Sequence, residues 1–154
     1  MASAQIGQVI PRLPVAEWLQ GEAVDFARLR GRVVLVEVFQ VNCPGCFLYA
    51  LPQAIDLYRR YSAQGLTVLG VATAFEDFDK NNRRNLQALL ETGQVVGATL
   101  KALAEHGHLL NGVWQYRIPF PVAVDRLVKA EQPVSEASGD EYIRQNLPAL
   151  GVQA

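Results

Sequence analysis

The two cysteines are the residues whose spacing most directly indicates chemistry. Cys43 and Cys46 enclose Pro44 and Gly45 in a Cys-x-x-Cys motif, and the sequence has no other cysteine. A disulfide between residues this close closes almost no loop, so it would stabilise the fold very little. The pair is therefore predicted to act chemically, by alternating between a dithiol and a disulfide.

The segments on either side of the motif predict a strand followed by a helix. Residues 33–39 are almost continuously apolar and rich in β-branched side chains, which is typical of a strand covered on both faces. We expect it to be the central strand. Residues 47–58 carry apolar side chains at helical spacing, with a bend expected at Pro52. The motif then lies at the carboxyl edge of the sheet, where functional groups of open α/β folds collect.

This position predicts that Cys43 is the attacking thiol. Near a helix N-cap its sulfur meets unpaired backbone N–H groups and the positive end of the helix dipole, which favour the thiolate. Cysteines placed in this way have pKa values between roughly 3.5 and 7.5, against about 8.5 for a free thiol. Pro44 is tolerated in the first turn. Cys46, one turn deeper, is predicted to resolve the mixed disulfide.

The rest of the chain predicts an α/β fold in one compact domain spanning 1–154. Residues 66–72 read as a second buried strand, which makes a right-handed strand–helix–strand unit. Residues 76–80 are predicted to form a solvated loop that caps the next helix. Further elements are predicted as helices ending near Gly93 and Gly107, a strand at 122–124, and a last helix from Ser138 to Leu147.

Composition argues against several classes of partner. The chain has 14 basic and 15 acidic residues and no basic block, so nucleic acid is not expected as a partner. No apolar segment reaches the length of a membrane span, so no membrane association is expected. Without an exported leader the chain as written reads as cytoplasmic; removal of a signal peptide would make it periplasmic.

A metal site is not expected. His106 and His108, the only histidines, are separated by one residue instead of the three to five usual in zinc fingers. Thiol–disulfide exchange needs no metal and no cofactor. Inert burial of both cysteines is the other alternative, and the strand-to-helix context argues against it.

Three segments in order resemble a known family: Trp18–Glu22, Leu29–Val36 and Phe39–Cys46. They are similar to the opening of TlpA-like members of the thioredoxin superfamily, close to the AhpC/TSA peroxiredoxin-like group. The likeness covers residues 8–75 well and the remainder loosely. It implies a thioredoxin-like sheet flanked by helices, and dithiol–disulfide exchange with protein or small-molecule partners.

The resemblance also implies roles for further residues. Glu37, six residues before Cys43, occupies the place of a buried acid that helps to deprotonate the resolving cysteine. The alternative, given equal weight, is an edge position with Glu37 in water. Pro44, Gly45 and Pro119 are implied as substrate contacts, with Pro119 as the family's cis-proline. Residues 118–125 resemble even more closely the strand that precedes that proline by some tens of residues.

Two departures from the family bear on the fold. Pro52 is six residues after Cys46 where five is usual, so the helix is expected to start or bulge differently. The 29 residues after Asp125 contain no apolar run suited to a closing β-hairpin. We therefore expect a sheet that is incomplete at its C-terminal end, either in a truncated chain or in one completed by a second copy, and we predict a homodimer.

Two other functions remain open. A peroxiredoxin-like peroxidase would use Cys43 against peroxide, but Gln40 stands where such enzymes carry threonine; Arg117 or Arg126 would supply the cation. A redox-inactive binding module would use residues 76–117 as a partner surface. The sequence does not determine whether the pair reduces or oxidises its partner.

Overall fold

The computed structural model of the chain describes residues 7, 9 and 13–127. The chain divides into two units, and Arg12–Leu127 forms the one described below. The predicted helix over 138–147 lies outside the described residues, and the single domain spanning 1–154 stays a prediction.

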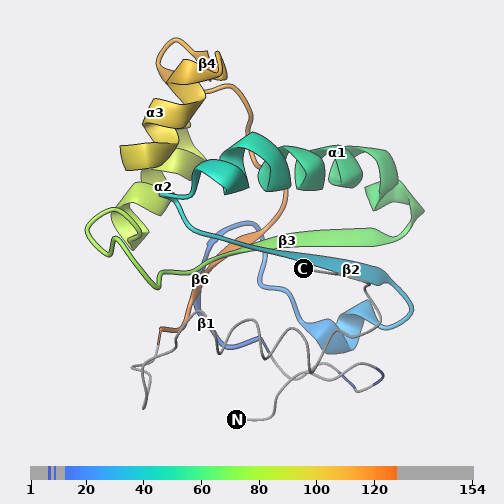
Figure 1. The fold of residues 1–154 in the computed structure, drawn as a ribbon. Helices are drawn as coiled ribbons and strands as arrows, with labels where there is room; N and C mark the ends of the chain where they lie inside the picture. The colour runs from blue at the N-terminus through green and yellow to red at the C-terminus, as the bar shows by residue number, and fades with distance from the viewer. Residues whose placement is uncertain (1–6, 8, 10–12, 128–154) are drawn as a thin grey trace, which may run out of the picture. The chain divides into compact units, whose positions relative to one another are not determined.

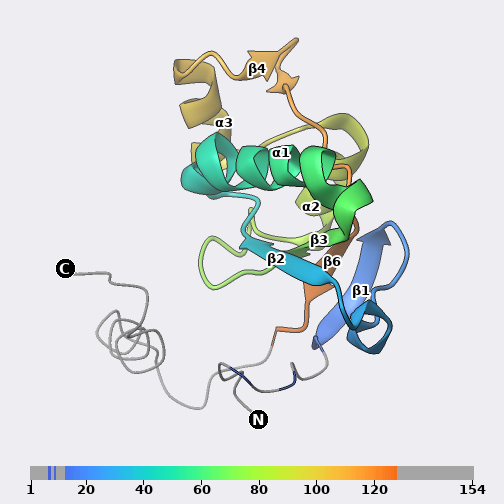
Figure 2. The ribbon, with the colours of Figure 1, turned by 90° about the vertical axis from the view of Figure 1, so that its right-hand side faces the viewer.

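The fold is α/β, as predicted, and is built on a four-stranded sheet (Figures 1 and 2). The strands β2, β3 and β6 are parallel, and β1 pairs with β6 in the antiparallel direction. The order across the sheet is β1-β6-β3-β2. The bounds are Val15–Gln20 for β1, Val33–Phe39 for β2, Leu66–Ala72 for β3 and Val122–Asp125 for β6.

The prediction that residues 33–39 form the central strand is wrong for the sheet of the described residues. β2 is an edge strand, and Val33 and Val38 are 70% and 57% exposed. The apolar pattern of a strand reports what covers its two faces, and it carries no information about neighbours in the hydrogen-bonding direction. The strand itself was therefore predictable, whereas its place in the sheet was not.

Three helices lie on the same side of the sheet (Figure 1). They are α1 (Leu51–Tyr61), α2 (Arg83–Thr92) and α3 (Gly97–Glu105), and a small hairpin of β4 (Leu109–Leu110) and β5 (Val113–Trp114) follows. Short 3-10 turns occupy Phe26–Leu29 and Ser62–Gln64. No helix among the described residues is long and apolar enough to cross a membrane.

The main core lies between these helices and the sheet. Aromatic rings fill its centre, where Phe47 contacts both Phe39 and Trp114 edge to face, with ring centroids 6.5 and 4.8 Å apart. The fully buried large side chains of this core include Phe39, Phe47, Leu51, Ile55, Leu86, Leu103, Trp114 and Phe120. These contacts fix α1, and with it the helix start that carries the motif, against β2 and β3.

The two helices predicted to end near glycines end in different ways. Gly93 ends α2 in the left-handed conformation, with a φ of 79°, and its N–H bonds to the carbonyl of Leu89. α3 ends at Glu105, two residues before Gly107, which also has a positive φ. The strand β1 was not predicted, because the register of Trp18 and its neighbours against β6 is a tertiary contact.

Candidate active site

The motif lies directly after β2, at the edge where the parallel strands end. A turn over Val41 and Asn42 leads to Cys43, and the helix begins at Pro44. Cys43 and Cys46 form a disulfide, with their Cα atoms 5.3 Å apart. The backbone N–H of Cys46 points at Sγ of Cys43, with an N to Sγ distance of 3.3 Å. The first sulfur therefore stands at the helix start, where the sequence places it.

The helix does not start as a regular α-helix. Residues Cys46–Ala50 form a π-turn, in which the N–H of Leu51 donates to the carbonyl of Cys46 five residues earlier. A π-turn accommodates one extra residue. Pro52 follows immediately, as the second residue of α1, inside a helix that is continuous from Pro44, so the π-turn lies where the backbone has to accommodate a residue without an N–H. The expected bulge is confirmed. Its one extra residue explains why Pro52 lies six residues after Cys46, where five is usual.

The two cysteines have different surroundings. Cys46 packs against the apolar core, next to the fully buried Phe47. Cys43 is half-buried and is not part of that core, and Gly45 is exposed at the tip of the turn. Both cysteines are half-buried, and they differ in the apolar contacts of Cys46 and in the helix-start position of the Cys43 sulfur.

Glu37 has features of both positions considered from the sequence, a buried acid and an acid at the sheet edge. It stands on the edge strand β2, yet its side chain is only half exposed. Alternation along the strand puts it on the same face as Leu35 and Phe39, which pack into the core below α1. Its register partner is Gly70, which has no side chain to cover it. Partial burial raises the pKa of the Glu37 carboxyl above its ordinary value.

The expectation that Pro119 is the family's cis-proline beside the redox pair does not hold. No cis peptide bond occurs between residues 13 and 127, and Pro119 is exposed. It precedes β6, so it lies where that strand enters the sheet, whereas Cys43 follows the end at which β2 leaves it. The alternative interpretation is confirmed, because Val122–Asp125 forms a strand parallel to β3.

A buried polar network behind the motif was not predicted. It joins Gln40 and Asn42, the residues just before Cys43, to the loop over residues 73–82, which we call the β3–α2 loop. The amide oxygen of Gln40 accepts from the N–H of Phe75 at 3.1 Å and from Nδ2 of Asn81 at 3.2 Å. The N–H of Asn42 donates to Oδ1 of Asn81 at 2.7 Å.

The side chain of Asn42 extends this network to a third element. Its Oδ1 accepts from the N–H of Ala98, at 2.8 Å, and of Thr99, at 3.3 Å, in the first turn of α3. Its Nδ2 donates to Oδ2 of Asp77 at 2.7 Å. The fit is tight, since a Cβ on Gly97 would collide with the Asn42 amide. Among the described residues, the buried polar side chains are Gln40, Asn42, Asn81 and Thr99, and all four belong to this network.

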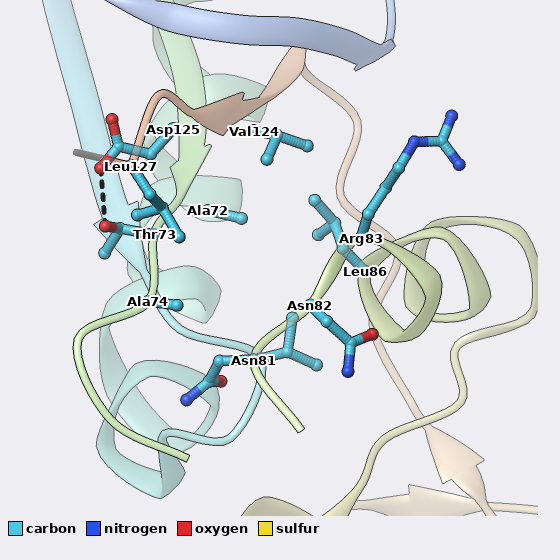
Figure 3. Close-up of a pocket in the computed structure, with 11 residues that line it drawn as sticks. Ala72, Thr73, Ala74, Asn81, Asn82, Arg83, Leu86, Val124, Asp125 and Leu127 are labelled. Atoms are coloured by element: carbon cyan, nitrogen blue, oxygen red, sulfur yellow. Dashed lines mark hydrogen bonds between the residues drawn. The ribbon is translucent and has the colours of Figure 1, made fainter. Parts of the chain in front are cut away.

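A shallow pocket lies at the same edge of the sheet but does not include the disulfide (Figure 3). Its walls come from the ends of β3 and β6 and from the start of α2. The hydroxyl of Thr73 donates to Oδ2 of Asp125 at 2.7 Å, and the Asn81 and Asn82 side chains bond to the backbone of their own loop. These polar groups therefore have partners within the chain, and the pocket shows no set of groups left for a ligand.

Comparison with known proteins relates this arrangement to thiol–disulfide chemistry. A thiol-disulfide isomerase from Corynebacterium glutamicum is 29% identical over 88% of this chain and 72% of its own, with a TM-score of 0.57. A solved thioredoxin-like superfamily protein is 27% identical over 84% of this chain and 70% of its own, with a TM-score of 0.56. No protein-family model matches the chain.

The curated relatives are much longer proteins. Protein DipZ of Mycobacterium tuberculosis and of Mycobacterium bovis is 33% identical over 69 residues, which are 43% of this chain. The chain spans about a tenth of the length of DipZ. Together with the fold and the Cys43–Cys46 disulfide, the solved structures show that this chain resembles thioredoxin-like proteins, the resemblance expected from its sequence.

Proposed function

We propose that the protein is a thiol–disulfide oxidoreductase that works through Cys43 and Cys46. The observation that carries the proposal is the Cys43 sulfur at the helix start, bonded to Cys46 and facing its N–H at 3.3 Å. The same N–H and the helix dipole would stabilise the Cys43 thiolate once the disulfide is reduced. The solved relatives of like fold include a thiol-disulfide isomerase.

The proposed reaction has two exchange steps. The Cys43 thiolate attacks one sulfur of a substrate disulfide, forms a mixed disulfide, and expels the other substrate sulfur as a thiolate. Cys46, after losing its proton, attacks Sγ of Cys43 and releases the second substrate thiolate. The protein is left with the Cys43–Cys46 disulfide, and the substrate has gained two electrons. Run in reverse, the same steps oxidise a dithiol.

Three further residues, Glu37, Pro44 and Gly45, are proposed to assist. Glu37, with its raised pKa, is suited to take the proton of Cys46 as that thiol attacks, because a carboxylate with a higher pKa is a better base. Pro44 and Gly45 lie between the two cysteines in the sequence, and Gly45 is exposed. A substrate bonded to Cys43 would touch both, so we assign them to substrate contact.

The proposed partners are protein or small-molecule disulfides and dithiols. Nucleic acid and membrane remain disfavoured on the charge and hydropathy of the sequence. The homodimer also stays a proposal, supported by the position of β2 at an edge of the described sheet.

Trapping experiments test the exchange directly. Incubation with glutathione disulfide should give the Cys46→Ser variant a stable mixed disulfide at Cys43, identified by peptide mass spectrometry. The Cys43→Ser variant should form much less of it, and the wild-type protein should pass to the Cys43–Cys46 disulfide. Equal trapping at either cysteine, or none at Cys43, would refute the proposed roles.

The same proteins separate the two rival functions. Gln40, at the position where peroxidases carry threonine, is engaged with Phe75 and Asn81, which supports exchange over peroxide reduction. Steady consumption of hydrogen peroxide at a rate matching disulfide reduction would favour the peroxidase. A Cys43 thiol that reacts with neither oxidant would favour the binding module.

A further inference from the structure

The β3–α2 loop presents two large apolar side chains to solvent. Phe75 and Phe78 are 71% and 62% exposed, and they lie three positions apart in the sequence. An exposed phenylalanine loses the free energy that burying its ring would supply, which is about 1.5–3 kcal/mol. Two such rings on one short loop are apolar surface that a bound partner could cover.

This loop is hydrogen-bonded to the residues that lead to the redox motif. Gln40 accepts from the N–H of Phe75, and Asn42 donates to the Asp77 carboxylate at 2.7 Å. Asp77 adopts a φ of 44°, a conformation unfavourable for a residue with a side chain, and its carbonyl accepts the N–H of Lys80 and of Asn81 at 2.8 Å. The exposure of the two rings is therefore built into an ordered loop.

The loop lies beside the disulfide. Asn42, which bonds to the loop, is the residue covalently before Cys43. Figures 1 and 2 both show the loop between β3 and α2 next to the point where the chain leaves β2 for the helix. A polypeptide bonded through its own cysteine to Cys43 would therefore have its neighbouring residues within reach of the two rings.

The charge on the loop indicates which side chains a partner would carry. Glu76, Asp77 and Asp79 are exposed, and one cation, Lys80, accompanies them and pairs with Asp79 at 2.9 Å. The loop thus combines aromatic rings with an excess of negative charge, which complements apolar side chains flanked by lysine or arginine.

We infer that the β3–α2 loop is a docking surface for polypeptide substrates that carry apolar and basic residues next to the reacting cysteine. The inference rests on the proposed disulfide exchange and specifies its substrate class. Binding energy gained at Phe75 and Phe78 would hold the substrate disulfide against Cys43.

Three disulfide substrates test this docking surface on the full chain. Two peptides carry the same intramolecular disulfide, one flanked by leucine and lysine and the other by serine and glycine; the third substrate is glutathione disulfide. Phe75→Ser with Phe78→Ser should lower kcat/KM for the leucine–lysine peptide at least tenfold, mainly through KM. The other two substrates should change less than twofold.

Val33→Ser is the matched control, since Val33 is 70% exposed at the opposite end of β2. It should leave all three rates unchanged. Glu76→Gln with Asp79→Asn should lower kcat/KM for the leucine–lysine peptide and leave that for the serine–glycine peptide unchanged. Sedimentation velocity of the double phenylalanine variant should match that of the wild type.

Several results would overturn the inference. Equal losses on all three substrates would show that the loop affects the cysteines themselves, and no loss on the leucine–lysine peptide would show that the rings bind nothing. A change of oligomeric state in the double variant would identify the loop as an interface between copies. Failure of the wild-type protein to reduce any of the three would instead refute the proposed function.

Discussion

At the scale of single residues, the chemistry depends on two groups with opposite electrostatic surroundings. Cys43 faces a backbone N–H at the start of a helix, which favours its charged form. Glu37 is half-buried beside the apolar face of β2, which favours its neutral form. In the proposed exchange, Cys43 supplies the attacking thiolate and the Glu37 carboxylate accepts the proton of Cys46.

Glu37→Gln tests the acid in two ways. The variant should resolve mixed disulfides about tenfold more slowly, because glutamine cannot take the proton of Cys46. The expected loss is modest for general base catalysis, since water also reaches this half-exposed site. We would measure this as single-turnover decay of a glutathione mixed disulfide on Cys43. An unchanged rate would remove Glu37 from the mechanism.

The same substitution predicts a pH dependence of stability. Because burial raises the pKa of Glu37 in the folded state, the folded protein binds the proton more tightly than the unfolded chain does. Wild-type stability should therefore fall, relative to Glu37→Gln, as pH rises from about 4 towards 7. Urea unfolding at both pH values measures this, and a constant difference between the two proteins would contradict it.

At the scale of elements, sequence patterns predict the strand and the helix of the site but not what lies behind them. The apolar run before Cys43 and the late Pro52 both have local physical causes, and both predictions hold. Asn42 gives no such signal, because its partners are 35 to 57 residues away in the β3–α2 loop and α3. Pro119 was misplaced for a related reason: its local sequence fits two positions that only tertiary structure distinguishes.

A charge exchange tests whether Asn42 and Asp77 form one interaction. Asn42→Asp should destabilise the protein by about 2 kcal/mol or more, because two carboxylates would then meet where an amide now donates. Adding Asp77→Asn returns one donor and one carboxylate to the site, and should recover most of that loss.

The reactivity of the Cys43 thiol should change in parallel with the stability of these two variants. We expect the alkylation rate at pH 7 to fall in Asn42→Asp and to recover in the double variant, because the turn that presents Cys43 depends on Asn42. Independent, additive effects of the two substitutions on unfolding and alkylation would show that the contact does not hold the motif.

At the scale of the whole molecule, the α/β class and the thioredoxin-like fold follow from sequence, whereas the position of β2 does not. Phe39 directs its carbonyl to the N–H of Thr73, so alternation along the strand turns the polar groups of Val38 towards the outer edge. In the sheet of the described residues this edge has no neighbouring strand. Such edges recruit strands from other chains.

The proposed homodimer can be tested at this edge. Val38→Lys places a charge on the edge strand, which proteins commonly use to prevent pairing, and Val38 is already 57% exposed. Sedimentation velocity should show a dimer for the wild type and for Leu110→Lys, an equally exposed control on β4, and a monomer for Val38→Lys. A monomeric wild type would refute the dimer.

The reactivity of Cys43 as a function of pH is the measurement that bears most directly on the account. In the Cys46→Ser variant Cys43 is the single cysteine, so the rate of its alkylation by iodoacetamide reports its thiolate alone. We predict a midpoint well below the value of about 8.5 for a free thiol, and a return to that value when the protein is unfolded in urea. A folded-state midpoint at or above 8.5 would show that the helix start does not activate this sulfur.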